Sequence, residues 1–239
     1  MTLSPFSSDY SSARDHFRKA VGDVSGAQLE SITYPVRGPS DEELTTDVAW
    51  IGPRDAPKVL VTVSGTHGVE GFCGSGAQID WLERREALRL PPDTAALLIH
   101  AINPYGFAWK RRVTHENVDL NRNWVDFSAA AGKNKEYSEI ADIVCPAEWG
   151  VESRERDQAA LHECAAKYTF PKFVQIVSGG QHTHPEGLFY GGKEPTVART
   201  TLASILAKHL SEARSVGIID YHSGLGPPGF GELIASAPI

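Results

Sequence analysis

The sequence is short of cysteine, of basic residues and of long apolar runs, and each shortage argues against a class of protein. Its three cysteines, Cys73, Cys145 and Cys164, are an odd number without metal-type spacing, which predicts reduced, mostly buried thiols rather than disulfides. The formal net charge of −7 argues against a nucleic-acid partner, since binding a phosphate backbone needs a basic surface. No apolar run approaches the roughly 20 residues that cross a bilayer. The first ten residues also lack the pattern of a secretion signal, so we expect no membrane partner and a cytoplasmic location.

The 239 residues are enough for one larger domain, which we place at 1–239. Apolar, β-branched runs alternate with helical patterns along the chain. We expect strands at 29–36, 44–51, 59–63, 95–102 and 216–222, and helices at 10–21, 74–88, 153–168 and 196–213. This order predicts an α/β fold with a doubly wound, mixed but mainly parallel sheet and helices on both faces. The first two strands should form an antiparallel edge, the last strand should be buried, and Leu88 should face the core.

One predicted strand leads into a glycine-rich turn that carries a histidine and a glutamate. His67 and Glu70 follow the apolar run 59–63 on this turn, and its three glycines suit a tightly bent backbone. An imidazole and a carboxylate at this spacing can converge on one cation. Alone the pattern is weak, because a histidine at a strand end is more often simply hydrogen-bonded and Glu70 could cap the next helix.

A second histidine stands at a corresponding place later in the chain. His222 ends the predicted strand 216–222, and ligands of doubly wound sheets gather outside the carboxyl ends of strands. Two imidazoles and one carboxylate form the usual ligand set of a catalytic zinc that keeps a fourth position for water. His67, Glu70 and His222 are therefore candidate ligands for one Zn²⁺ ion.

Further motifs between these ligands make the signal specific. The stretch 103–124 holds an Asn-Pro-Tyr-Gly turn at 103–106, Arg112, and an Asn-Val-Asp-Leu-Asn-Arg-Asn run ending at Asn123. Taken with the His-x-x-Glu pair and the late histidine, this ordered set resembles the zinc carboxypeptidase superfamily, the carboxypeptidase A-like metallopeptidases. The resemblance covers about residues 58–127 and 214–224.

The resemblance implies a role for each matching residue. His67, Glu70 and His222 would bind zinc, and Arg112 would stabilise the carbonyl oxygen as it becomes an oxyanion. Arg111 would take that role if the register is displaced by one residue. The resemblance assigns the substrate's terminal carboxylate to two residues of the Asn-Arg-Asn run, Asn121 and Arg122. The alternatives are solvated surface arginines and ordinary turn residues.

Two histidines and the end of the chain depart from the family pattern. His182 and His184 alternate on an extended segment and form either a second metal site or, as we favour, a polar loop that contacts substrate at the rim of the pocket. The family's late glutamate base has no counterpart, so Glu232 is the fallback base. The run 232–237 resembles the start of a strand, so we expect a domain that lacks its last strands and helix.

The sequence therefore predicts a zinc-dependent hydrolase of an amide bond next to a free carboxylate, acting on a small peptide. The alternatives are an N-acyl amino acid deacylase on the same scaffold and a catalytically impaired module that binds zinc and carboxylates. A dinucleotide-binding protein is disfavoured, because the glycine-rich turn lacks the G-x-G-x-x-G order. The sequence makes no prediction of the oligomeric state.

Overall fold

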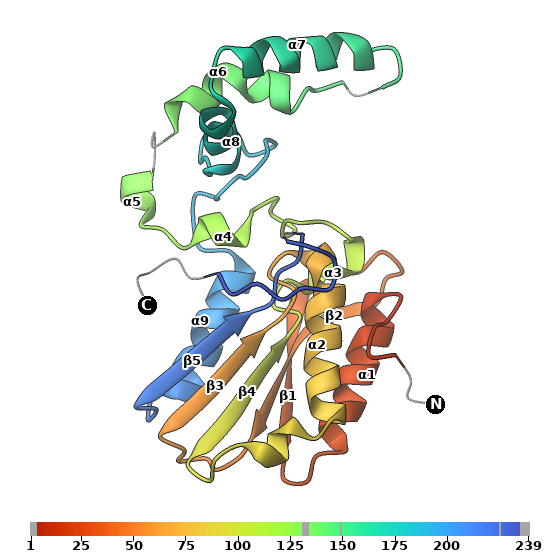
Figure 1. Cartoon of the computed structure of the whole chain (residues 1–239), viewed down its shortest axis with the longest axis vertical. Helices are drawn as coiled ribbons and strands as arrows, with labels where there is room; N and C mark the ends of the chain where they lie inside the picture. Colours follow the sequence, from red (N-terminus) through yellow and green to blue (C-terminus); the bar gives the residue numbers. More distant parts are fainter. Residues whose placement is uncertain (1–3, 131–133, 149, 225, 235–239) are drawn as a thin grey trace.

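A mixed β-sheet forms the centre of the structure (Figure 1). The computed structural model describes residues 4–130, 134–148, 150–224 and 226–234. Within these residues the sheet has the strand order β1-β2-β4-β3-β5. The strands are β1 (Gln28–Arg37), β2 (Glu43–Ile51), β3 (Lys58–Val63), β4 (Thr94–His100) and β5 (Ser215–Asp220). Strands β4, β3 and β5 are parallel, whereas β1 and β2 form the predicted antiparallel edge.

Helices cover both faces of the sheet, as the apolar strands predict. Along β4, Ala96 and Leu98 pack with residues of α1 (Tyr10–Gly22) and α2 (Gly71–Glu83) on one face. The alternate residues of β4 pack with α9 (Val197–Leu210) on the other face. Helix α1 begins as expected, because the Asp9 carboxylate accepts a hydrogen bond from the Ser12 N–H at 2.8 Å.

Two details of the predicted elements are wrong. The expected helix 74–88 ends at Glu83, because Arg85 adopts a left-handed conformation with φ 58°. Leu88 then lies on a short 3₁₀ turn and is exposed rather than directed at the core. The last strand, β5, is also exposed, with Ile218 at 57%, because within the described residues it pairs only with β3 and forms an edge of the sheet.

The cysteines agree with the prediction in part. All three are free thiols, as expected. Only Cys164 is buried, whereas Cys145 is partly exposed and Cys73 is exposed on the first turn of α2. The expectation of mostly buried thiols is therefore wrong.

A group of helices lies beyond the carboxyl ends of the parallel strands (Figure 1). It contains α6 (Lys135–Val144), α7 (Arg154–Ala166) and α8 (Phe170–Ser178), after the single turn α5 (Phe127–Ala130). These helices share their own apolar cluster, which includes Tyr137, Ile140 and Ile176. The Asn134 side chain joins the two ends of the group, since its Nδ2 donates to the carbonyls of Ile176 at 2.8 Å and Gly180 at 3.0 Å.

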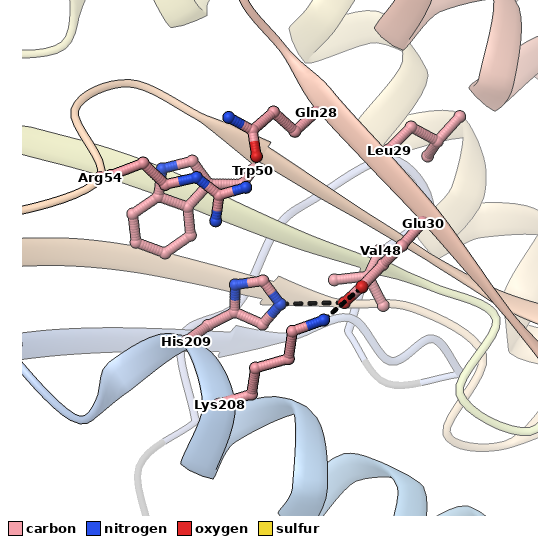
Figure 2. Close-up of a pocket in the computed structure, with 8 residues that line it drawn as sticks. All are labelled: Gln28, Leu29, Glu30, Val48, Trp50, Arg54, Lys208 and His209. Carbon is pink, nitrogen blue, oxygen red and sulfur yellow. Dashed lines mark hydrogen bonds and ion pairs between the residues drawn. The ribbon is translucent and has the colours of Figure 1, made fainter.

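A shallow cavity lies where the last turn of α9 meets β1 and β2 (Figure 2). His209 stacks on Trp50 with ring centroids 5.7 Å apart, and its Nε2 lies 3.0 Å from Glu30 Oε1. Lys208 pairs with the same carboxylate. None of the predicted site residues lines this cavity. No helix among the described residues has the length and apolar character needed to span a bilayer.

Candidate metal centre

Two neighbouring parallel strands bring the predicted metal ligands together. Val63 at the end of β3 lies opposite Asp220 at the end of β5 in the parallel register. His67 and Glu70 follow β3 closely, and His222 follows β5 by two residues. The three side chains therefore meet at the carboxyl edge of the sheet, although 152 residues separate Glu70 from His222.

The Glu70 carboxylate lies between the two imidazole rings. Its Oε1 is 3.0 Å from His67 Nδ1 and its Oε2 is 3.1 Å from His222 Nδ1. The ring centroids of the histidines are 4.9 Å apart, and one ligand atom from each of the three residues lies within 4.8 Å of the others. Ligand atoms this close need only small side-chain movements to surround a tetrahedral zinc at bonds of about 2.0–2.2 Å.

Each imidazole is also held from behind by a second carboxylate. His67 Nε2 lies 3.1 Å from Asp119 Oδ1, and His222 Nε2 lies 2.8 Å from Asp220 Oδ2. The other oxygen of Asp220 accepts a hydrogen bond from Thr66 Oγ1 at 2.8 Å. Histidine ligands of metals commonly use their outer nitrogen in this way, which fixes the ring and raises its basicity.

The charges around the rings support a cation site. Burial would raise the pKa of Glu70, but hydrogen bonds from His222 and His67 lower it far below the usual range. Hydrogen bonds to Asp220 and Glu70 raise the pKa of His222 to about 10. The pKa of His67 is also raised, because its bonds to Asp119 and Glu70 outweigh its burial. A metal ion would replace the two inner ring protons, so metal binding would release protons here. The donor set therefore fits a divalent ion such as zinc.

The turn that carries His67 and Glu70 depends on a close approach to α3 (Pro104–Trp109). A Cβ atom added to Gly68 would lie 1.8 Å from the carbonyl carbon of Gly106, so only glycine fits there. Asn103 caps α3 through a 2.9 Å bond from the Gly106 N–H to its Oδ1, and its Nδ2 points to the Thr66 carbonyl at 3.5 Å. The Asn-Pro-Tyr-Gly motif thus packs α3 against the turn.

Arg112 lies beside the ligand cluster. Its Nε donates to Asp119 Oδ2 at 2.9 Å, and its Nη1 is 3.6 Å from Glu70 Oε1. The side chain is 40% exposed. Arg111 is exposed, and no contact joins it to the cluster among the described residues.

The residues of α4 (Leu120–Asn123) have different surroundings. Asn121 is exposed, and its backbone N–H is capped by Asp119. The Nε and Nη2 of Arg122 both donate to the Ser178 carbonyl, at 2.9 and 2.7 Å, so Arg122 does not present a free fork. Asn123 is fully buried and binds the backbone of the segment 191–196.

The two histidines of the segment 181–192 have separate partners. His182 Nδ1 lies 2.7 Å from the Gly192 carbonyl, whereas His184 Nδ1 lies 2.8 Å from Thr183 Oγ1. Neither belongs to the one group of potential metal ligands found in the described part of the chain. The segment is bonded to the Asp-x-Asn-Arg-Asn region, since the Asp119 N–H donates to the Tyr190 carbonyl at 2.8 Å.

Glu232 lies outside the ligand group of the described residues. It is exposed in an irregular segment that follows β5, and residues 232–234 form no strand. The remainder of the expected strand, 235–237, lies outside the described residues. Figure 1 shows the segment after β5 running along the carboxyl edge of the sheet.

Sequence reasoning missed two carboxylates that support the centre. The roles assigned from the sequence do not include Asp119, which begins the Asp-x-Asn-Arg-Asn run, or Asp220, which precedes His222 by two residues. The signal for Asp220 was an aspartate two positions before a predicted ligand, because alternate residues at a strand end lie on the same side. Asp119 is buried and lacks such a local signal, since it reaches His67 from 52 residues away.

Solved structures of several proteins resemble this chain in part. A metallo-carboxypeptidase from Burkholderia cenocepacia is 22% identical over 46% of this chain and 31% of its own, with a TM-score of 0.32. An aspartoacylase family protein from Mesorhizobium loti is 14% identical over 83% and 72%, with a TM-score of 0.29. A glutaminyl cyclase from Porphyromonas gingivalis is 12% identical over 96% and 88%, with a TM-score of 0.29.

The carboxypeptidase match spans about a third of that enzyme's length, and all three TM-scores are low. The names therefore describe those proteins alone. No curated protein matches the sequence. A family model described as "Protein of unknown function (DUF2817)" matches residues 6–238, nearly the whole chain. The chain belongs to the DUF2817 family.

Proposed function

We propose that this protein is a zinc-dependent hydrolase of an amide bond next to a free carboxylate, in a small peptide or an N-acyl amino acid. The observation that carries the proposal is the cluster of His67, Glu70 and His222, in which both imidazoles are backed by carboxylates. The cluster has the ligand types of a catalytic zinc with an open fourth position.

Each nearby group has a proposed part in hydrolysis. Zinc, when bound, polarises a carbonyl and lowers the pKa of water to about 7. The Arg112 guanidinium would donate to the carbonyl oxygen as negative charge develops on it, which is where a fixed donor is most effective. Asn121, which is exposed, would donate to the substrate carboxylate. Arg122 would assist only through N–H groups that the Ser178 and Asn121 carbonyls leave free.

The remaining roles stay predictions. Arg111 is exposed and would attract the substrate's carboxylate by charge. His182 and His184 would contact substrate from the segment 181–192. Glu232 would serve as the general base, and the segment that carries it runs along the carboxyl edge of the sheet (Figure 1).

A binding module without turnover is the second candidate. It is favoured by the position of Glu232, which no contact joins to the ligand cluster among the described residues. Such a module would bind zinc and carboxylates through the same residues and release no product. A deacylase would share the zinc site with a peptidase and differ only in the substrates it accepts.

Zinc reconstitution followed by a substrate panel tests the proposal. The purified protein should bind one equivalent of zinc and hydrolyse members of a panel of short peptides and N-acyl amino acids. A chelator and the substitution His67→Ala should both abolish zinc binding and turnover, whereas His162→Ala, at an exposed position on α7, should change neither. Zinc binding without turnover of any substrate would favour the module, and absence of zinc binding would refute both candidates.

A further inference from the structure

A phenylalanine beside the candidate centre has an unusual backbone conformation. Phe189 has φ 52°, in the left-handed region that large side chains rarely adopt. It is the only aromatic residue with a positive φ in the described part of the chain. Such a conformation persists only where the surroundings impose it, and strained residues of this kind cluster at functional sites.

The backbone bonds on either side of Phe189 impose this conformation. Its carbonyl accepts a hydrogen bond from the Gln181 N–H at 3.2 Å, and the Gly191 N–H donates to the Gln181 carbonyl at 2.8 Å. Between them, the Tyr190 carbonyl accepts from the Asp119 N–H at 2.8 Å. Phe189 is therefore attached through its neighbour to the carboxylate residue that supports His67.

The ring of Phe189 contacts two guanidinium groups. The Cζ of Arg112 lies 5.2 Å from the ring centroid, and the Cζ of Arg122 lies 5.8 Å from it. Both distances are within the range of a cation–π interaction. Arg122 is fixed by the Ser178 carbonyl, whereas Arg112 has one short bond, to Asp119, and extends toward Glu70. The ring is thus a further contact, beside those with Asp119 and Glu70, that limits how the Arg112 guanidinium is oriented.

We propose that Phe189 is a positioning residue that holds the Arg112 guanidinium toward the metal centre. The catalytic consequence rests on the proposed hydrolase function, but the orientation of Arg112 does not. Simple apolar packing would make a different prediction, because leucine would replace phenylalanine without loss. A cation–π contact requires an aromatic face.

The orientation is tested first in the metal-free protein, by NMR of the arginine side-chain Nε–H groups. Arg112→Lys identifies the Arg112 signal by its loss. In Phe189→Leu that signal should lose the ring-current shift of the phenylalanine and exchange faster with water, while Phe189→Tyr should retain both properties. Phe189→Gly separates strain from ring contact, since it suits a positive φ but should give the same altered signal as leucine. An unchanged Arg112 signal in Phe189→Leu would overturn the proposal.

Kinetics of the zinc-loaded protein form the second test. If Arg112 acts on charge that develops in the transition state, Phe189→Leu should lower kcat roughly 3- to 10-fold with little change in KM. Phe189→Tyr, which keeps an aromatic face, should retain the kcat of the natural protein. Trp124→Leu is the control, because this exposed ring contacts a different guanidinium, that of Arg199, at 5.1 Å. Equal kinetics in the natural protein and Phe189→Leu would overturn the catalytic consequence. A natural protein without turnover would refute the proposed function, while the NMR result would still decide the orientation.

Discussion

Asp119 and His67 are joined by a 3.1 Å contact between a buried carboxylate and a buried ring nitrogen. The other oxygen of Asp119 accepts from Arg112, so one carboxylate orients both a candidate ligand and a candidate catalytic arginine. Burial would raise the pKa of Asp119, but the hydrogen bond with His67 and the charges of His67 and Arg112 outweigh burial and lower this pKa to about 2.

Replacing this carboxylate should weaken metal binding. In Asp119→Asn the His67 ring loses its charged partner, and loss of such a partner typically costs about 10–100-fold in metal affinity. Competition with a coloured zinc chelator measures the change. Asp55→Asn, at an exposed position away from the cluster, should leave the affinity unaltered. An unchanged affinity in Asp119→Asn would mean that the contact does not support the metal site.

A methyl group at position 68 should disturb the ligand turn. Gly68→Ala places Cβ against the Gly106 backbone, which cannot yield without moving α3. We expect a loss of about 1–3 kcal/mol in the free energy of unfolding, as for other overpacked sites, and weaker zinc binding. Gly22→Ala, where a Cβ meets nothing within 4 Å, should change stability by less than about 1 kcal/mol. Urea unfolding of both variants decides the matter.

The neighbouring asparagines of α4 should separate stability from binding. Asn123→Ala removes bonds to the Gly191 and Glu194 carbonyls and to the Thr196 N–H, all in a buried place. This should cost about 2–4 kcal/mol of unfolding free energy. Asn121→Ala should change stability by less than about 0.5 kcal/mol, because its side chain is exposed, but should raise KM for carboxylate substrates. Thermal unfolding measures the stability of both variants, and steady-state kinetics measures their KM. An equal loss of stability in the two variants would contradict the prediction.

A buried histidine away from the centre should make stability depend on pH. Burial lowers the pKa of His100 to about 4 from the usual 6.5, because the charged ring has lost its water. Between these values the unfolded chain binds more protons than the folded protein, so stability falls as pH decreases from 6.5 toward 4. At pH 5 the loss relative to pH 7 should be about 2 kcal/mol. His100→Gln should lose less stability over the same range in urea titrations.

Local sequence patterns were enough to predict the strands of the sheet and the proximity of the candidate metal ligands. Apolar runs such as 95–102 can be read as buried strands because each alternate side chain meets a helix on one face or the other. His67 and His222 could be joined because the ends of parallel strands share one edge of a sheet. Both inferences need only the type of each element and its place in the chain.

Features that depend on distant partners could not be read in this way. The exposure of β5 depends on which strand lies beside it, and its apolar residues resemble those of a central strand. The Arg122 guanidinium is occupied by hydrogen bonds to the carbonyl of Ser178, which lies 56 residues away in the sequence. Phe189 gave no signal because its conformation results from bonds made by Gln181 and Asp119.

Asn134, directly before α6, donates hydrogen bonds to the carbonyls of Ile176 and Gly180 at the end of α8, so the two ends of the α6–α8 group lie together. What lies between two fixed ends can change in length or content at small entropic cost to the rest of the chain. We therefore expect this helix group, a cap beyond the carboxyl ends of the parallel strands, to tolerate changes of length that leave the metal centre intact. Lengthening the α6–α7 connection should leave zinc affinity and melting temperature unaltered, and a fall in either would show that cap and sheet are not independent.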